Sequence, residues 1–316
     1  MMTIRRKAAA AYVGDSDLER RKRIRNLKED VTASWFLLPI CAVFVILFAV
    51  PLAQTLYYSF TDWDGLNLNP GWVGMENYVK IFSDTSILEG LGFTIVYALL
   101  TTLLVTAIAI PLAVQLNQRF FGRNFARSLF FFLSVPSLAL MGMVWKLILS
   151  PLKSGMVNTL LVNLGLDSVP WLSNSRLAQG CVIFVGVWAQ IGWHATLYLA
   201  YLQSIPSDLY EQARVDGANA RQQFIHITLP QLTPGIVVSM FLLMSGGLKV
   251  YDLPFTLTGG GPGFATNTVS QTIIDRGIGQ QQYGIASALS VLFTIAMCVV
   301  IFAQLGIANM IQRRFV

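Results

Sequence analysis

The chain has 316 residues, of which 54% are hydrophobic and only 12% are charged, and its formal net charge is +6. A soluble domain carries roughly 25% charged residues, so water cannot cover the surface of this protein on all sides. The composition excludes a disordered chain, a nucleic-acid-binding module and an ordinary cytosolic enzyme, and it favours a protein that crosses a membrane several times.

Six apolar runs follow one another along the chain, each close to the roughly 20 residues that cross a bilayer. They cover residues 33–57, 91–114, 126–149, 179–202, 234–250 and 285–308. Because lipid offers no partners to unpaired backbone groups, each run is expected to be a helix, and no alternating β-barrel pattern is visible. The sequence therefore predicts an all-α polytopic membrane protein, with a polar segment at 1–32 before a six-helix domain at 33–316.

Lysine and arginine residues are distributed unevenly among the segments that flank these runs. Apart from Lys146 and Lys249 at the ends of runs, sixteen lie in one alternating set of segments and four in the other. Positive residues accumulate on the cytoplasmic side of a membrane. We therefore expect both termini, and the segment between the fourth and fifth runs, to be cytoplasmic.

Motifs of catalytic and metal sites are missing from the sequence. It contains no GxxxxGK[ST] phosphate loop, no HExxH and no nucleophile elbow, and its two histidines, His194 and His226, lie in different segments. The cysteines Cys41, Cys181 and Cys298 are dispersed in apolar runs, without metal-ligand spacing. We predict no catalytic residue, no metal site and no cofactor in this chain.

The most informative segment is the loop at 205–230. Its pattern predicts two short helices, separated by a tight turn that Gly217 permits. Pro230 is expected to end the second helix at Leu229, because a residue before proline disfavours the helical region. By its residues alone, the loop could also be a short amphipathic segment that lies on the membrane.

This loop resembles the EAA loop of the permease subunits of binding-protein-dependent ABC importers. The matching residues are Tyr210, Glu211-Gln212-Ala213, Asp216-Gly217-Ala218 and Ile227-Thr228-Leu229-Pro230, in which Gln212 replaces the usual alanine. Further matches favour the carbohydrate branch of maltose, multiple-sugar and glycerol-3-phosphate permeases. They are Trp145-Lys146, Gly155-Met156-Val157-Asn158, Trp188, Leu257 to Gly263 with Thr266, and Tyr283-Gly284.

The resemblance implies a type I ABC importer permease fold in a bacterial inner membrane. It implies a sugar-uptake system with a second homologous permease, an ATPase dimer that binds ATP and Mg²⁺, and an extracytoplasmic solute-binding protein. The EAA loop would dock on the ATPase, through Tyr210, Glu211, Ala213, Asp216, Gly217, Ala218, Leu229 and Pro230. In that position Glu211 would meet charged groups of the ATPase or cap the second helix.

Polar groups at membrane depth are candidates for the substrate pathway. Gln190 and His194 are four residues apart and share one helix face, with Trp193 and Tyr198 nearby. A second group, Lys249, Tyr251 and Asp252, follows Gly246-Gly247, which we expect to interrupt the fifth run. These groups could instead bond to one another or contact the second permease.

Three other functions compete with a sugar permease. An ion-coupled secondary transporter would need acidic or cationic groups inside its spans, and charge is nearly absent there. A membrane enzyme would show clustered Asp or His motifs, and none is present. An ABC permease for glycerol-3-phosphate or another polar solute remains open.

Overall fold

The computed structural model describes residues 37–315, which leaves the polar segment at 1–32 outside the described residues. Within the described range the chain is helical, and its one β-bridge joins Thr61 to Trp72. The chain divides into two compact units at Tyr57 and Tyr58. The fold is therefore all-α, as expected.

The first apolar run forms a single helix of 22 residues, Leu37–Tyr58, which belongs to the first unit up to Tyr57. This helix includes a π-helical turn, η1 (Val45–Ala49), followed by α2 (Val50–Tyr58). Its most apolar stretch carries no buried residue. A helix that is apolar all round and long enough to cross a bilayer is suited to lipid.

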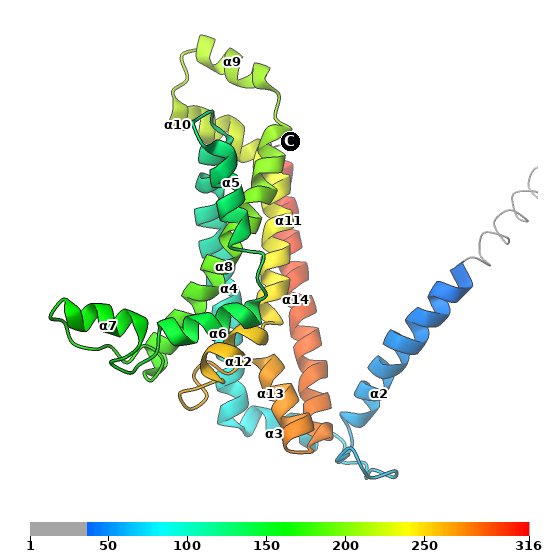
Figure 1. The fold of residues 1–316 in the computed structure, drawn as a ribbon. Helices are drawn as coiled ribbons and strands as arrows, with labels where there is room; N and C mark the ends of the chain where they lie inside the picture. Colours follow the sequence, from blue (N-terminus) through cyan, green and yellow to red (C-terminus); the bar gives the residue numbers. More distant parts are fainter. Residues whose placement is uncertain (1–36, 316) are drawn as a thin grey trace, which may run out of the picture. The chain divides into compact units, whose positions relative to one another are not determined.

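The second unit is built on four long helices: α4 (Thr85–Asn117), α8 (Ser175–Gln203), α11 (Leu229–Leu248) and α14 (Tyr283–Phe315). Helix α4 packs along both α8 and α11, and α11 also packs on α14 (Figure 1). All four lie in stretches that are long and apolar enough to cross a membrane. Together with the first unit, this confirms five of the six expected runs as continuous helices.

Glycine residues bring these helices close together. On α11, a Cβ added to Gly247 would lie 2.9 Å from the Cα of Ala98 on α4. On α8, a Cβ added to Gly186 would meet the ring of Tyr97. Small residues allow such close backbone approach in membranes, where helix association depends on packing rather than on the exclusion of water.

The third apolar run differs from the expectation of one helix. It forms α5 (Arg123–Phe132), which packs on α8, and α6 (Leu138–Ile148), which packs on α12 (Asp252–Thr258). Pro136 disfavours helix at the residue before it, and the hydroxyl of Ser137 accepts a hydrogen bond from the Leu140 amide to begin α6. The continuous third helix was therefore a wrong prediction, and within residues 37–315 five helices rather than six are long and apolar enough to cross a membrane.

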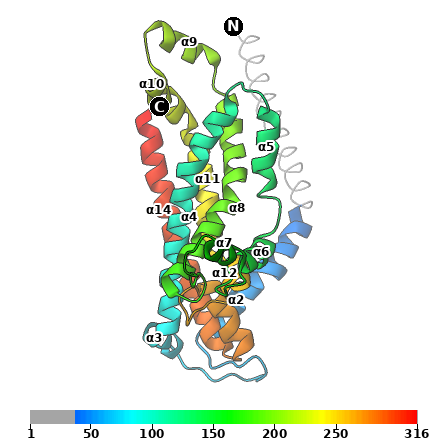
Figure 2. The same ribbon diagram turned by 60° about the vertical axis from the view of Figure 1, so that its left-hand side comes forward.

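Shorter elements lie around the long helices. They are α3 (Glu76–Ser83), α7 (Met156–Asn163), α13 (Val269–Ile274) and the π-helical turn η3 (Asp275–Gly279). Helix α7 projects sideways from the second unit in Figure 1 and lies in the foreground in Figure 2. Its buried Asn158 donates to the carbonyls of Ser150, Leu152 and Val169 and accepts from the Val169 amide and the Trp171 indole. This one side chain thus joins both ends of the connection between α6 and α8.

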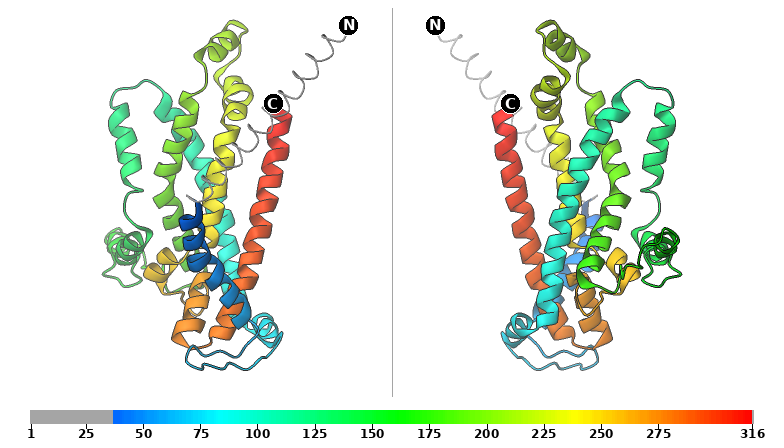
Figure 3. Two further views of the ribbon diagram at one scale, coloured as in Figure 1. Left: turned by 90° about the vertical axis from the view of Figure 1, so that its right-hand side faces the viewer. Right: turned by 90° about the vertical axis from the view of Figure 1, so that its left-hand side faces the viewer.

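The two ends of the second unit carry different connections. Helices α9 (Ser207–Val215) and α10 (Ala220–Gln223) lie at one end, together with the α4–α5 connection and the last turns of α14 (Figure 3). We call this the elbow end. Helices α3 and α13 lie at the opposite end (Figures 1 and 3).

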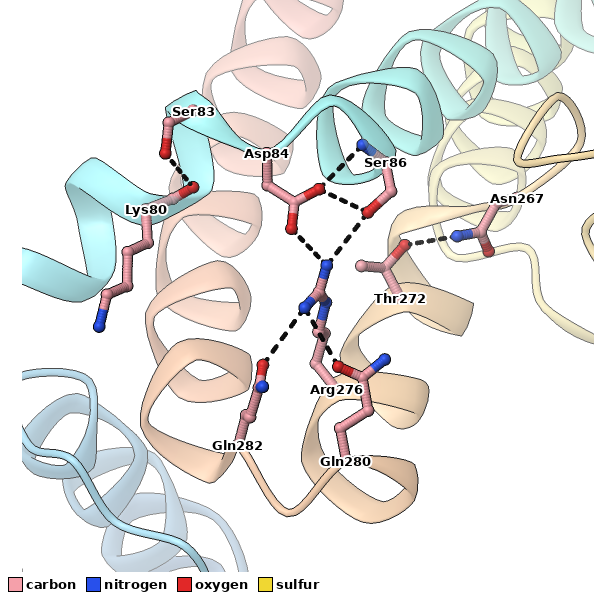
Figure 4. A network of polar contacts seen from close by, with 9 residues as sticks. All are labelled: Lys80, Ser83, Asp84, Ser86, Asn267, Thr272, Arg276, Gln280 and Gln282. Carbon is pink, nitrogen blue, oxygen red and sulfur yellow. Dashed lines mark hydrogen bonds and ion pairs between the residues drawn. The ribbon is translucent and has the colours of Figure 1, made fainter.

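A polar network connects elements at that opposite end. The guanidinium of Arg276, in η3, forms an ion pair with Asp84 and a 3.1 Å hydrogen bond to the hydroxyl of Ser86 at the start of α4. It also donates to the side-chain oxygens of Gln280 and Gln282 (Figure 4). The network joins the beginning of α4 to the turn that leads into α14.

Candidate functional site

The segment 205–230 forms the elbow that the sequence predicts. Helix α9 ends at Val215, and Gly217 has a φ of 81°, which lies in the left-handed region. The Gly217 amide donates to the carbonyl of Arg214, and the Ala218 amide donates to that of Ala213 at 2.8 Å. The predicted glycine turn is therefore confirmed.

Helix α10 begins with a capping box. The side chain of Asn219 accepts a hydrogen bond from the Gln222 amide, and the side chain of Gln222 accepts one from the Asn219 amide. The cap therefore comes from Asn219 and Gln222, so the alternative that Glu211 caps this helix is wrong. Glu211 lies on α9 and is exposed.

The helix after the elbow does not end at Pro230. One helical stretch runs from Ala220 to Leu248, through α10, the π-helical turn η2 (Phe224–Thr228) and α11. The amide of Leu229 donates to the carbonyl of Phe224, as the wider π turn allows, so Pro230 stands at the start of α11. The predicted break at Leu229 was wrong, and the elbow is continuous with a long helix.

The two arms of the elbow are joined at their base. The hydroxyl of Tyr210 on α9 lies 3.0 Å from that of Thr228, within hydrogen-bond distance. The outer surface is exposed at Asp216, Gly217 and Val215, whose side chain is 89% exposed. Ala213, Ala218, Leu229 and Pro230 are half-buried. The elbow thus presents a surface that no described part of the chain covers.

A second candidate region lies within the helices. Gln190, Trp193 and His194 of α8 line a pocket of about 270 Å³. Its other lining residues are Ala189, Leu242, Ser134 and Pro136 of the α5–α6 break, and Leu138 at the start of α6. Three of the predicted substrate-pathway residues therefore share one pocket. An interrupted helix at membrane depth often borders a translocation site.

Hydrogen bonds orient the polar groups of this pocket. His194 is buried, and its Nδ1 lies 2.7 Å from the hydroxyl of Ser239 on α11. The amide nitrogen of Gln190 donates to the carbonyl of Gly186 at 3.2 Å. Trp193 is 40% exposed, with its ring edge-on to that of His194. Tyr198 is fully buried beyond the pocket.

The remaining predicted pathway residues lie elsewhere. Helix α11 continues through Gly246 and Gly247 and ends at Leu248, so the expected interruption at the glycines was wrong. The break follows at Lys249 and Tyr251, before Asp252 begins α12. Lys249 and Asp252 are exposed, and none of the three lines the pocket. Ser134, which lines the pocket, and Ser239, which contacts His194, were not predicted from the sequence. The helix-breaking pair Pro136-Ser137 is the local feature that could have pointed to Ser134.

Comparison with known proteins identifies the chain's relatives. Residues 95–316 match the family described as "Binding-protein-dependent transport system inner membrane component". A probable ABC transporter permease of Sinorhizobium fredii is 35% identical, covering 88% of this chain and 89% of the relative. The multiple sugar-binding transport system permease protein MsmF of Streptococcus mutans is 32% identical, covering 84% of this chain and 91% of the relative.

A solved structure has the same fold. A chain of the crystal structure of a bacterial ABC transporter that imports the acidic polysaccharide alginate superimposes with a TM-score of 0.79 and 25% identity. The match covers 92% of this chain and 98% of that chain. The fold is thus that of an ABC importer permease of type I, as the sequence predicts.

Proposed function

This chain belongs to the family of inner-membrane components of binding-protein-dependent transport systems, and on that premise we propose that it is a permease subunit of an ATP-driven carbohydrate importer. The observation that carries the proposal is the similarity, over more than four-fifths of both chains, to a multiple-sugar permease. The structural likeness to an alginate importer supports the same substrate class.

The elbow is the proposed contact with the ATPase. Its residues match the EAA pattern, and its surface is exposed at the elbow end, which also carries the α4–α5 connection with Arg119 and Arg123. The positive-inside distribution supports a cytoplasmic position for this end and for both termini. In this arrangement a separate ATPase dimer binds ATP and Mg²⁺ and pushes on the elbow as it closes.

A continuous path leads from the elbow to the pocket. The helical stretch Ala220–Leu248 carries Ser239, which contacts His194 in the pocket. Since an α-helix rises 1.5 Å per residue, a push at Ala220 acts on Ser239 through roughly 28 Å of uninterrupted helix. The hydrogen bond between Tyr210 and Thr228 couples α9 to the same helix.

The pocket suits a saccharide in its chemistry. Gln190 and Ser134 offer polar groups, and the partly exposed ring of Trp193 offers an apolar face. We propose that this pocket forms one side of the pathway and that a second homologous permease supplies the other. An extracytoplasmic binding protein would deliver the sugar to the opposite end.

Uptake by proteoliposomes tests the proposal. The chain is reconstituted with its co-purified ATPase, second permease and binding protein, and labelled oligosaccharides are offered with ATP or with an ion gradient. We expect accumulation that requires ATP and binding protein. Uptake driven by an ion gradient alone would favour a secondary transporter, and uptake of glycerol-3-phosphate but no sugar would reassign the substrate.

A further inference from the structure

The connection between α4 and α5 combines positive charge with exposed aromatic rings. It reads Gln118-Arg119-Phe120-Phe121-Gly122-Arg123-Asn124-Phe125-Ala126-Arg127, and the sequence contains no Asp or Glu between Glu89 and Asp167. We call residues 118–125 the basic–aromatic loop. No carboxylate close in sequence neutralises its arginines.

The shape of this loop presents both kinds of side chain outward. Residues 119–125 line an open hollow of about 640 Å³. Phe121 is fully exposed and Phe125 is 74% exposed. Among residues 37–315, the guanidinium groups of Arg119 and Arg123 have no hydrogen-bond or ion-pair partner. These cations and rings are therefore available to something outside the chain.

Arg127 has a different role. Its Nε and Nη2 donate to the carbonyl of Leu116 at 3.0 and 2.7 Å. This pair of bonds ties the first turns of α5 to the end of α4 and holds the loop between them. Arg127 thus holds the shape of the loop, while Arg119 and Arg123, which belong to the loop, take no part in these bonds.

We propose that the basic–aromatic loop binds the headgroups of anionic phospholipids in the leaflet at the elbow end. The loop joins α4, a membrane-spanning helix, to α5, whose Leu129, Phe131 and Phe132 are exposed. At such a boundary, phenylalanine rings enter the edge of the acyl region while arginines meet phosphates. An exposed phenylalanine ring is unfavourable in water, and arginines without a nearby carboxylate favour an anionic partner. The surface of an anionic lipid leaflet satisfies both.

This inference depends on the chain crossing a membrane but not on the solute that it carries. A cytoplasmic protein partner with an acidic surface is the competing occupant. Such a partner would use the same arginines, but it would exclude lipid from the phenylalanine rings. The experiment therefore measures whether lipid reaches the loop in the assembled complex.

A fluorescent reporter beside the loop separates the two occupants. Asn124→Cys, in a variant whose Cys41, Cys181 and Cys298 are replaced by serine, is labelled with bimane in the reconstituted complex. Spin-labelled phosphatidylglycerol or phosphatidylcholine is added at equal mole fractions. Because each cation near an anionic surface contributes about fivefold to binding, we expect phosphatidylglycerol to quench the reporter severalfold more strongly.

Matched variants assign that preference to the loop. Arg119→Gln combined with Arg123→Gln should bring the two lipids to equal quenching, and the corresponding double lysine variant should retain most of the preference. Lys153→Gln combined with Arg176→Gln removes the same charge from other connections and should leave the preference unchanged.

Three results would overturn the proposal. They are equal quenching by both lipids in the unsubstituted loop, protection of the reporter from both lipids by the ATPase, and an equal loss in the Lys153/Arg176 control. Sugar uptake in the same proteoliposomes is measured separately, so a failed lipid preference leaves the proposed transport function standing.

Discussion

At the scale of single residues, Asp84 both begins a helix and holds a cation. One carboxylate oxygen accepts the amide and the hydroxyl of Ser86, and the other forms the ion pair with Arg276 (Figure 4). The pKa of Asp84 lies below its ordinary value, and the hydrogen bond from the Ser86 hydroxyl is the largest cause. The hydrogen bond from the Ser86 amide and the charge of Arg276 lower the pKa further. Folding therefore favours the ionised form.

The pH dependence of stability follows from this lowered pKa. The contribution of Asp84 is fully present above the ordinary aspartate pKa of about 3.9 and is lost as the pH falls through the lower pKa of the folded state. Asparagine caps a helix as well as aspartate does, so Asp84→Asn can keep the cap while it removes the charge and the acceptor oxygen that faces Arg276. We expect a loss of about 1 kcal/mol or less at neutral pH, since the side chain is 29% exposed and screened.

Thermal unfolding of the detergent-solubilised protein checks this expectation. The stability difference between Asp84→Asn and the unsubstituted protein should narrow as the pH approaches 3. Asp167→Asn, which changes an exposed carboxylate outside the network, is the control. A difference that stays constant from pH 7 to pH 3 would show that the charge contributes nothing.

Trp193 is the residue through which the pocket can be tested. Its ring is partly exposed beside Gln190 and His194, so Trp193→Ala removes the apolar face offered to a sugar. We expect the KM of uptake to rise by about tenfold or more, corresponding to roughly 1.4 kcal/mol of binding, with less effect on stability. Phe184→Ala on the same helix, outside the pocket, is the matched control. An unchanged KM for Trp193→Ala would remove this ring from the pathway.

At the scale of elements, the elbow depends on the left-handed conformation of Gly217. A Cβ there meets no atom within 4 Å, so any effect of substitution comes from the backbone rather than from crowding. A β-branched residue is strained at a φ of 81°, whereas asparagine tolerates the left-handed region.

We therefore expect Gly217→Val to abolish ATP-driven uptake, and Gly217→Asn to retain much of it. The amount of protein in the membrane should not change, since the elbow lies outside the packed helices. Gly180→Ala, which also has open space but no positive φ, should transport normally. Uptake by proteoliposomes and quantification of inserted protein measure the two effects. Normal transport by Gly217→Val would argue against the elbow as the coupling element.

The broken third run shows how an element acquires a role. As one helix, residues 126–149 would only have added a span to the bundle. The break at 133–137 instead brings Ser134 and Pro136 to the face of α8 that carries Gln190 and His194. The pocket exists because this helix stops and starts again.

At the scale of the second unit, close contact between α4 and α11 is the feature most open to test. Gly247→Ala places a methyl group 2.9 Å from the Cα of Ala98, a backbone atom that cannot rotate away. Overpacking of this kind costs about 1–3 kcal/mol. The adjacent Gly246 meets no atom within 4 Å, so Gly246→Ala should be neutral or slightly stabilising.

Thermal unfolding of both alanine variants in detergent distinguishes a specific contact from general helix propensity. The predicted order is Gly246→Ala, the unsubstituted protein and then Gly247→Ala, from most to least stable. Equal unfolding temperatures for the two variants would mean that α4 and α11 do not approach this closely.

Hydropathy, charge and one motif determined the helical membrane class, five of the continuous spans, the glycine turn and the family of this protein. These properties could be predicted because each depends on residues close together in the chain: an apolar run of sufficient length, a glycine in a turn, and a motif at fixed spacing. The coupling and lipid-binding roles stay predictions until they are measured.

Only the tertiary structure decided which of those elements meet. It placed the Pro136 break against Gln190, set His194 beside Ser239, and paired Asp84 with Arg276 across 192 residues of sequence. It also carried the helix past Pro230 through a π turn. Such outcomes depend on how side chains from distant segments fill the same space, and no local pattern of hydropathy or propensity contains that information.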